Sequence, residues 1–158
     1  MNEDFFDRKI KIGNNEVSLD ENKLKFNEAT LTKYFEEEAL HYDYYGRMLA
    51  DAEYLLQRNE LQYDVVSSEK FKMFKEAGGS DALCNAKVTS DEEVVEAKKL
   101  VLAAKRKVML LKQHLRAWDK AHENALNLGY TLRREMSKLN SSISYDDDAV
   151  NRIVGGGN

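Results

Sequence analysis

Hydrophobic and polar residues recur along the chain with two different periods, one typical of strands and one typical of helices. Residues 8–19, RKIKIGNNEVSL, alternate polar and apolar positions on both sides of the turn-forming residues 13–15. This period of two predicts a small β-hairpin within an N-terminal arm of residues 1–19. Because a two-stranded hairpin is marginal by itself, we expect it to pack on the helices or on a neighbouring copy of the chain.

From Asp20 onwards the apolar residues recur every three or four positions, which is typical of a helix that packs lengthwise on another helix. Nine of the twelve positions on this first seam are apolar or aromatic. The glycine pair that ends residues 71–79, FKMFKEAGG, predicts the end of the helix and a loop over about residues 77–89. The first seam consists of Leu24, Glu28, Leu31, Phe35, Glu38, Tyr42, Tyr45, Leu49, Ala52, Leu56, Asn59 and Tyr63.

A second long helix is predicted to begin at Ser90, where a capping serine is followed by acids that suit the positive end of a helix dipole. A helix from there to Leu139 would extend roughly 70 Å, which is longer than a compact domain of this size needs. We therefore expect the two helices to form an antiparallel helical hairpin over residues 20–139. The second seam consists of Val94, Ala97, Val101, Ala104, Val108, Leu111, Leu115, Trp118, His122, Ala125, Gly129, Leu132, Met136 and Leu139.

The last residues, 140–158, are first polar, then acidic and finally rich in glycine. This composition predicts a flexible tail. The expected fold is therefore mainly α: one helical hairpin domain, a small N-terminal β-hairpin and a flexible C-terminal tail. A length of 158 residues suits one such domain.

The overall composition narrows the classes of function. Charged residues make up 33% of the chain, proline is absent, and the formal net charge is -4. A nucleic-acid binder with this balance has to collect its cations on one patch, because the chain as a whole is not basic. The single cysteine, Cys84, fits a reducing cytoplasm, and the sequence shows neither a signal peptide nor a stretch apolar enough to span a membrane.

The apolar surface of the second helix is wider than one partner helix can cover. Beside the seam, a second apolar stripe runs along the same helix. Burial on two sides, once within the subunit and once between subunits, would cover both stripes. We therefore favour a homo-oligomer over a three-helix monomer in which the β-hairpin and the end of the first helix cover the second stripe. The residues expected at the interface between subunits are Val95, Leu102, Met109, Leu110 and Trp118.

Cations collect on the remaining arc of this helix. Between Ala97 and Trp118 there are seven cations and no acid, whereas residues 20–64 hold eleven acids and five bases. Like charges three and four residues apart repel one another, so something anionic should offset them. Either acids of the first helix, such as Glu36, Glu37 and Asp43, or a phosphate backbone would do so. The cations expected to contact phosphates are Lys98, Lys99, Lys105, Arg106, Lys107 and Lys112.

A second cationic cluster lies near the end of the first helix, where three lysines alternate with Phe71, Met73 and Phe74. Lysines interleaved with aromatic residues often hold single-stranded nucleic acid, because bases stack while cations follow phosphates. We favour a packing role for the phenylalanines, which can close the end of the helical hairpin, and a binding role for the lysines. These lysines are Lys70, Lys72 and Lys75.

The sequence carries none of the usual catalytic signatures. Its histidines, His41, His114 and His122, share no metal-ligand spacing, and Cys84 has no partner cysteine. A phosphate-cradling glycine loop and a nucleophile elbow are also missing. We therefore expect no enzymatic activity, no metal site and no cofactor.

Two blocks of the sequence resemble the UvsY-type recombination mediators of tailed phages. Residues 19–35, LDENKLKFNEATLTKYF, look like the start of that family's first helix. Residues 88–136, from VTSDEEVVEAKKLVLAAKRKVMLL through ALNLGYTLRREM, look like its long C-terminal helix. With the middle between them, the blocks cover about residues 19–139, and they are amphipathic patterns rather than a catalytic signature.

The resemblance implies an accessory factor that binds single-stranded DNA as a ring-like homo-oligomer in the cytoplasm of the infected bacterium. Such mediators help a RecA-like recombinase to load onto strands covered by a single-strand-binding protein, without hydrolysing ATP. The family has a basic run near the end of its first helix, of which this chain keeps only Arg58, within residues 55–63, LLQRNELQY. We therefore expect DNA contacts mainly on the second helix and at residues 70–75.

Two hypotheses follow for the function. The first is a helical homo-oligomer that binds single-stranded DNA through its basic stripe and assists a recombinase, with no reading of base sequence. The alternative is a structural or adaptor protein whose basic stripe pairs with acids of a neighbouring subunit or of another protein. Both are non-enzymatic, and neither involves a membrane.

Overall fold

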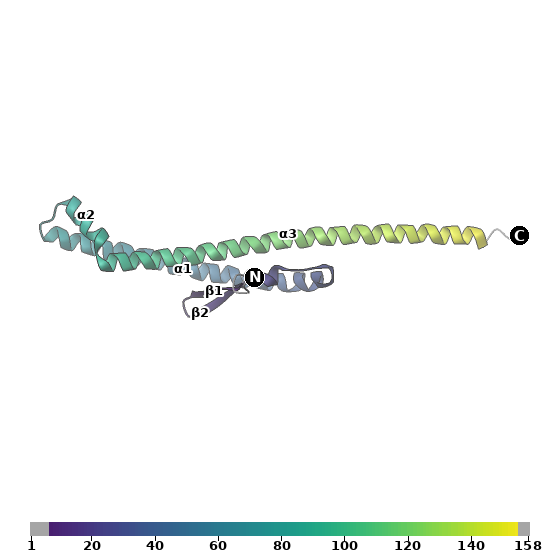
Figure 1. Cartoon of the computed structure of the whole chain (residues 1–158), viewed down its shortest axis with the longest axis horizontal. Helices are drawn as coiled ribbons and strands as arrows, with labels where there is room; N and C mark the ends of the chain where they lie inside the picture. The colour runs from purple at the N-terminus through teal and green to yellow at the C-terminus, as the bar shows by residue number, and fades with distance from the viewer. Residues whose placement is uncertain (1–6, 155–158) are drawn as a thin grey trace.

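Two long antiparallel helices and a small β-hairpin make up the fold (Figure 1). The computed structural model describes the backbone of residues 7–154 and, within that range, the side chains of residues 9–140. The mainly helical architecture and the N-terminal hairpin are confirmed. In chain order the elements are β1 (Asp7–Ile12), β2 (Asn15–Asp20), two 3-10 turns (Glu21–Leu24 and Glu28–Thr30), α1 (Leu31–Glu76), α2 (Asp81–Ser90) and α3 (Glu92–Val154).

The β-hairpin closes through a two-residue turn. Strands β1 and β2 are antiparallel, and Ile12 lies opposite Asn15, so the turn consists of Gly13 and Asn14. Gly13 has a φ of 57°, which a glycine at the first central position of a tight hairpin turn adopts without steric cost. Asn15 therefore belongs to the second strand rather than to the turn.

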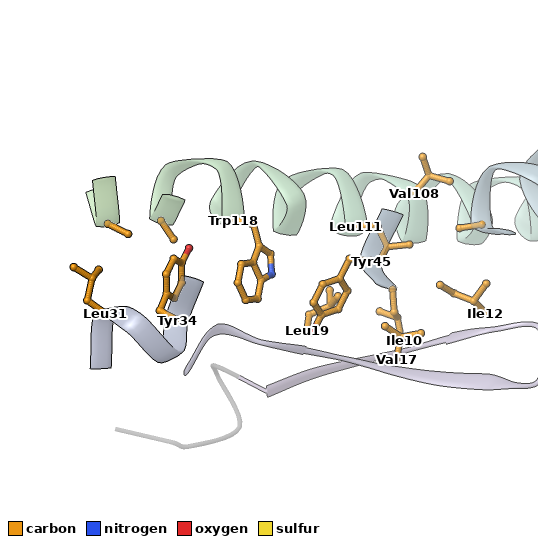
Figure 2. Packing of buried hydrophobic residues seen from close by; sticks show 13 residues of the cluster. Ile10, Ile12, Val17, Leu19, Leu31, Tyr34, Tyr45, Val108, Leu111 and Trp118 are labelled. Carbon is orange, nitrogen blue, oxygen red and sulfur yellow. The ribbon is translucent and has the colours of Figure 1, made fainter. Parts of the chain in front are cut away.

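The hydrophobic core lies between α1, α3 and one face of the hairpin (Figure 2). Trp118 and Leu111 of α3 are 1% and 0% exposed, and they pack near Tyr45 of α1, which is 2% exposed. Val17 of β2 is completely buried on the hairpin side of this cluster. The Tyr45 hydroxyl also donates a hydrogen bond to the Ser18 carbonyl oxygen, at 2.9 Å, and so connects α1 to β2.

The buried face of α3 follows the predicted seam as far as Leu111, and beyond Leu111 only part of the seam stays buried. His114 and Ala121 are buried where the seam predicted Leu115 and His122, which are only half-buried. The hairpin covers this flank, because Leu19 and His114 border the same small cavity. A seam derived for two helices alone does not include such a third element.

Helix α1 begins at Leu31 rather than at Asp20. Local hydrogen bonds hold residues 20–30 in two 3-10 turns instead. The Asn27 side chain accepts from the Thr30 amide at 3.0 Å, and the Thr30 hydroxyl accepts from the Asn27 amide at 2.9 Å. Such short side-chain bonds compete with the helical backbone pattern, so they account for the later start.

The predicted loop over residues 77–89 is wrong from residue 81 onwards, because residues 81–89 belong to the helix α2. The Ser80 hydroxyl caps this helix by accepting from the Leu83 amide at 3.4 Å, and Cys84, a residue of α2, is completely buried. The serine predicted to cap the second long helix, Ser90, is the last residue of α2, and its hydroxyl donates to the Ala86 and Lys87 carbonyls. The connecting loop therefore shrinks to residues 77–80.

The predicted flexible tail is also wrong for most of its length, because α3 continues to Val154. Neither proline nor glycine occurs between Gly129 and Gly155, so no helix-breaking residue interrupts this stretch. Residues 155–158, the last part of the predicted tail, and residues 1–6 of the predicted arm lie outside the described residues. With 63 residues, α3 is roughly 95 Å long by its rise per residue and projects far beyond the other elements (Figure 1).

Replacing Gly79 by alanine is expected to loosen the packing of α2. A Cβ at this position would lie 2.8 Å from Cys84 Sγ and 3.0 Å from the Phe74 carbonyl oxygen, so we expect a loss of about 1–3 kcal/mol in the free energy of unfolding. At Gly46 a Cβ meets nothing within 4 Å, and Gly46→Ala in the middle of α1 should instead gain about 0.5–1 kcal/mol. Urea unfolding followed by circular dichroism compares both variants. Equal stability of Gly79→Ala and the unchanged protein would contradict the close contact with Cys84.

Candidate nucleic-acid interface

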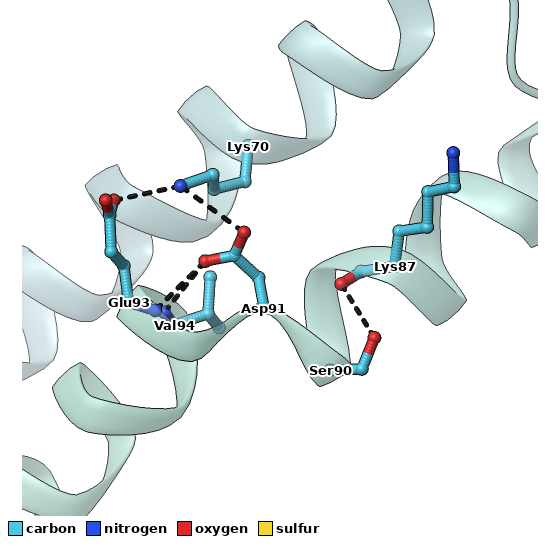
Figure 3. Close-up of polar contacts among 6 residues, drawn as sticks. All are labelled: Lys70, Lys87, Ser90, Asp91, Glu93 and Val94. Carbon is cyan, nitrogen blue, oxygen red and sulfur yellow. Dashed lines mark hydrogen bonds and ion pairs between the residues drawn. The ribbon is translucent and has the colours of Figure 1, made fainter.

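Hydrogen bonds and ion pairs with α1 hold the start of α3 in place (Figure 3). Asp91 Oδ1 accepts from the Glu93 amide at 3.0 Å and from the Val94 amide at 3.4 Å, so Asp91 caps α3. Lys70 Nζ of α1 lies 3.3 Å from the same carboxylate and 3.0 Å from Glu93 Oε2. The side chains of Lys70 and Asp91 are only 20% and 16% exposed. Lys70, predicted to bind DNA, is therefore already held between two carboxylates.

The pKa values at this junction change in the direction that an ion pair requires. The hydrogen bond to Glu93 is the largest cause that raises the pKa of Lys70, and Asp91 adds to it, while burial opposes the rise. Burial alone would raise the pKa of Asp91, but the Lys70 ammonium and the backbone amides of Val94 and Glu93 together lower it. Both groups therefore keep their charges over the whole neutral range.

The other predicted cations of α1 are more exposed. Lys75 Nζ lies 2.6 Å from Asp81 Oδ1 of α2, and Lys72 Nζ lies 4.0 Å from Glu76 in its own helix. Arg58 is exposed and makes no ion pair with a described carboxylate. The three lysines near the end of α1 therefore pair with three different sets of acids, and Arg58 lies more than three turns before them.

The row Lys98, Lys105 and Lys112 runs along α3 on the flank that faces α1. Lys105 Nζ lies 3.4 Å from Glu60, and Lys112 Nζ lies 2.8 Å from Glu53. The two lysine side chains remain 59% and 51% exposed. Because exposed ion pairs of this kind contribute at most about 1 kcal/mol, a polyanion can take over these ammonium groups at little cost.

The acids that face this row are not the ones that the sequence suggested. Glu37 pairs with Lys33 at 3.7 Å, and Asp43 pairs with Arg47, in both cases within α1. The antiparallel arrangement instead places Glu53 and Glu60 opposite the row. Residues in the first part of α1 lie farther along α3, beside Trp118 and His122.

An exposed apolar strip on α3 separates the row of Lys98 from a second row of cations. Leu102 and Met109 are each 59% exposed, and by helical geometry they lie between the row of Lys98 and the row of Lys99 and Arg106. Lys99 Nζ lies 2.6 Å from Glu96 in the same helix. The ammonium group of Lys98 lies over the Tyr63 ring, 6.0 Å from its centroid.

A cationic groove separates β1 from α3. It has a volume of about 720 Å³. Ile10 and Ile12 of β1 point into the core, so Lys9 and Lys11 lie on the other face of the strand. Lys9 also pairs with Glu16 of β2 at 3.2 Å, with both side chains more than half exposed. The lining residues are Lys9, Ile10, Lys11, Ala103, Arg106, Lys107 and Leu110.

The sequence prediction missed the two hairpin lysines of this groove. The signal was present, because the alternation of RKIKI that predicted the strand also predicts that its lysines share one face. What the alternation does not contain is the position of the hairpin relative to α3. That position brings Lys9 and Lys11 to the same groove as Arg106 and Lys107.

The residues predicted to form an interface between subunits divide into three groups. Trp118 lies in the core of its own subunit at 1% exposed, so its assignment to such an interface is wrong. Val95 and Leu110 are half-buried, and Leu110 lines the cationic groove. Leu102 and Met109 are free to contact another molecule.

Farther along α3 the charge changes sign. A shallow depression of about 830 Å³ is bordered by Glu38 and Asp43 of α1 and by Asp119 and Glu123 of α3. His122 Nδ1 lies 2.7 Å from Glu38 Oε1 at the same place. The acid-free run of cations on α3 therefore lies beside the hairpin, and a group of carboxylates borders the next part of the helix.

The described residues offer neither a metal site nor a membrane-spanning helix as an alternative to the basic surface. Within the described residues, no three histidine, cysteine, aspartate or glutamate side chains are placed to hold a metal ion. None of the described helices combines the length and the apolar character that crossing a membrane requires. Comparisons with protein families, with curated proteins and with solved structures gave no match to this chain.

Proposed function

We propose that the chain is a mediator of DNA recombination that binds single-stranded DNA and helps to load a RecA-like recombinase onto strands covered by a single-strand-binding protein. The observation that carries this proposal is the collection of cations on residues 97–118 of α3, where no acid interrupts them. The protein acts as a ring-like homo-oligomer, without catalysis, in the cytoplasm of a phage-infected bacterium. The resemblance to UvsY-type mediators supplies the recombinase, the single-strand-binding protein and the phage setting.

The chemistry of the basic stripe supports binding of single-stranded DNA without selection of its sequence. Cations flank the exposed side chains of Leu102 and Met109, so phosphates can follow the cations while unpaired bases pack on the apolar strip. Side chains that read base edges by paired hydrogen bonds, such as glutamine or asparagine, do not form this strip. The contacts thus position a strand without selecting its sequence.

The projecting part of α3 supports assembly with further copies of the chain. Gly129 is close to Leu31 at the start of α1, because a Cβ added there would lie 3.8 Å from Leu31 Cδ2. Beyond that point α3 projects past α1 (Figure 1), with Tyr130 and Met136 57% and 63% exposed. Met136 belongs to the last part of the predicted seam, so a helix of another subunit is the natural partner for it.

A structural or adaptor protein is the second candidate. The pairs of Lys105 with Glu60 and of Lys112 with Glu53 favour it, because they show that carboxylates can satisfy part of the stripe. Native mass measurement combined with titration of a fluorescent oligonucleotide separates the two candidates. An oligomer without affinity for DNA would favour the adaptor, whereas affinity that requires the oligomer would favour the mediator.

Removing the row that faces α1 is expected to weaken DNA binding and its salt dependence. In Lys98→Ala/Lys105→Ala/Lys112→Ala, loss of three phosphate contacts should lower the slope of log affinity against log salt by about 2, at roughly 0.7 per contact. Fluorescence anisotropy of a labelled oligo-dT across ionic strength measures this slope. A triple variant that binds as the unchanged protein does at every salt concentration would rule out the row as a contact site.

A charge-matched control removes three other cations. Lys33, Arg47 and Lys120 each pair with an acid within their own helix and are more than 70% exposed. Their replacement by alanine changes the net charge by the same amount as the row variant. An equal loss of affinity in both triple variants would mean that net charge, rather than the row, determines binding.

A further inference from the structure

The two outer edges of the β-hairpin differ in what contacts their backbone groups. Ile12 and Asn15 flank the two-residue turn. In an antiparallel pair, hydrogen-bonded and non-hydrogen-bonded residue pairs alternate, so Ile10 and Val17 form a hydrogen-bonded pair. The backbone N–H and C=O groups of Lys9 and Lys11 therefore point outward, away from β2. The bond from Tyr45 to the Ser18 carbonyl confirms this alternation from the opposite strand, because Ser18 is the partner of Lys9.

The edge of β2 is thus contacted by α1, whereas the edge of β1 borders the cationic groove. Among the described residues, no backbone hydrogen bond reaches Lys9 or Lys11 from outside the hairpin. An open strand edge offers alternating donors and acceptors to any chain that adopts an extended conformation. The groove beside it has room for one, with a volume of about 720 Å³.

We propose that this groove binds an acidic, extended segment of a partner protein, which adds to β1 as a third strand. The incoming strand would pair with the outward backbone groups of Lys9 and Lys11. Its acidic side chains would lie on the outer face beside these lysines, and its alternate side chains would face Ala103 and Leu110 of α3. Arg106 and Lys107 at the rim of the groove favour a segment with a net negative charge.

The charges of the groove also exclude a second copy of the same edge. If two β1 strands paired edge to edge, their lysines would face each other, together with the arginine and lysine of each α3. Lysines on an edge strand commonly prevent such self-association, and here they do so while leaving the edge open to an acidic strand. A nucleic acid would use the cations of the groove but not the alternating donors and acceptors of the edge.

The inference goes beyond the proposed function and does not depend on it. The probe is a fluorescein-labelled, capped peptide of alternating glutamate and valine. Its controls are a glutamine-valine peptide and the glutamate-valine peptide N-methylated at every residue, which cannot donate to a ladder. In the unchanged protein, hydrogen exchange at the amides of Lys9 and Lys11 should slow on addition of the glutamate-valine peptide. The Ile10 amide, already bonded to β2, should change little.

Two variants separate pairing with the edge from attraction between charges. Lys11→Gln keeps the backbone amide and should weaken peptide binding about two- to fivefold through the lost charge pair. Lys11→Pro removes the outward amide as well, at an edge position that tolerates proline, and should weaken it by about a further fivefold, the net value of one hydrogen bond. Amide exchange in the unchanged protein does not depend on whether the proline variant folds.

Several results would overturn the proposal. Equal binding of the glutamate-valine peptide and its N-methylated form would reduce the groove to a general anion site. The same holds if the amides of Lys9 and Lys11 exchange at unchanged rates with the peptide bound. Protection of these amides by oligo-dT, but not by the peptide, would assign the groove to DNA instead.

Discussion

Trp118→Ala is expected to lower the free energy of unfolding by about 3–5 kcal/mol, the usual loss for a large aromatic side chain removed from a core. Trp118 is 1% exposed, and its ring stacks on Tyr34 with a centroid distance of 6.1 Å and tilts against His41 at 5.4 Å. Its indole Nε1 also donates to His114 Nε2 at 3.1 Å. The variant therefore leaves a cavity between the two long helices and an unpaired acceptor on a buried histidine.

Unfolding in urea at the lowest measurable protein concentration reports this loss for the subunit itself. Trp118→Phe keeps most of the aromatic volume and should be clearly less destabilised than the alanine variant. Leu102→Ala and Met109→Ala, at residues that are each 59% exposed, should stay within about 0.5 kcal/mol of the unchanged protein. A Trp118→Ala protein as stable as these surface variants would show that the core lies elsewhere.

The helices were predictable because their periodic apolar positions extend over many turns. Val94, Ala97, Val101 and Ala104 are all buried, as the spacing alone predicts. The departures arise where a local bond or a third element outweighs periodicity. The Asn27 and Thr30 bonds delay the start of α1, and the hairpin moves the buried face of α3 to His114. Neither effect has a signature in the spacing of apolar residues.

The sequence predicted which residues of the candidate site are cations, but not which carboxylates they pair with. The acid-free run of cations on the second helix is a property of the sequence, and the structure leaves Lys98, Arg106 and Lys107 without a described ion pair. By contrast, the hold on Lys70 depends on where the end of α1 meets the cap of α3. Such contacts depend on the relative position of elements far apart in the sequence, which periodicity does not determine.

The division of charge along α3 links the two proposals. The cationic part adjoins the hairpin, and the carboxylates of Asp119 and Glu123 follow about two turns beyond Lys112. A strand of DNA on the stripe and an acidic segment in the groove would both contact the face that carries Arg106 and Lys107. Binding of one should therefore weaken binding of the other, since two polyanions repel each other at such short distances. A partner protein with an acidic segment could in this way promote release of DNA.

Acid is expected to destabilise the fold through His114. Burial lowers the pKa of His114 to about 4 from its usual value of about 6.5, with the Asp20 carboxylate acting in the opposite direction. The hydrogen bond from Trp118 requires an unprotonated Nε2, because the indole N–H can only donate, so the buried ring is neutral with its proton on Nδ1. Protonation would place two donors against each other in the core.

The linkage has a definite sign and pH window. Above pH 6.5 both the folded and the unfolded chain hold His114 neutral, and stability is unaffected by it. Between pH 6.5 and 4 only the unfolded chain binds the proton, so the free energy of unfolding falls by up to about 1.4 kcal/mol per pH unit, or roughly 3 kcal/mol in all. His114→Gln, whose amide oxygen can still accept from the indole, should remove this dependence, although it costs some stability at pH 7. Urea unfolding of both proteins at pH 7.5, 6, 5 and 4 tests the expectation, and parallel curves for the two proteins would show that other groups cause the acid sensitivity.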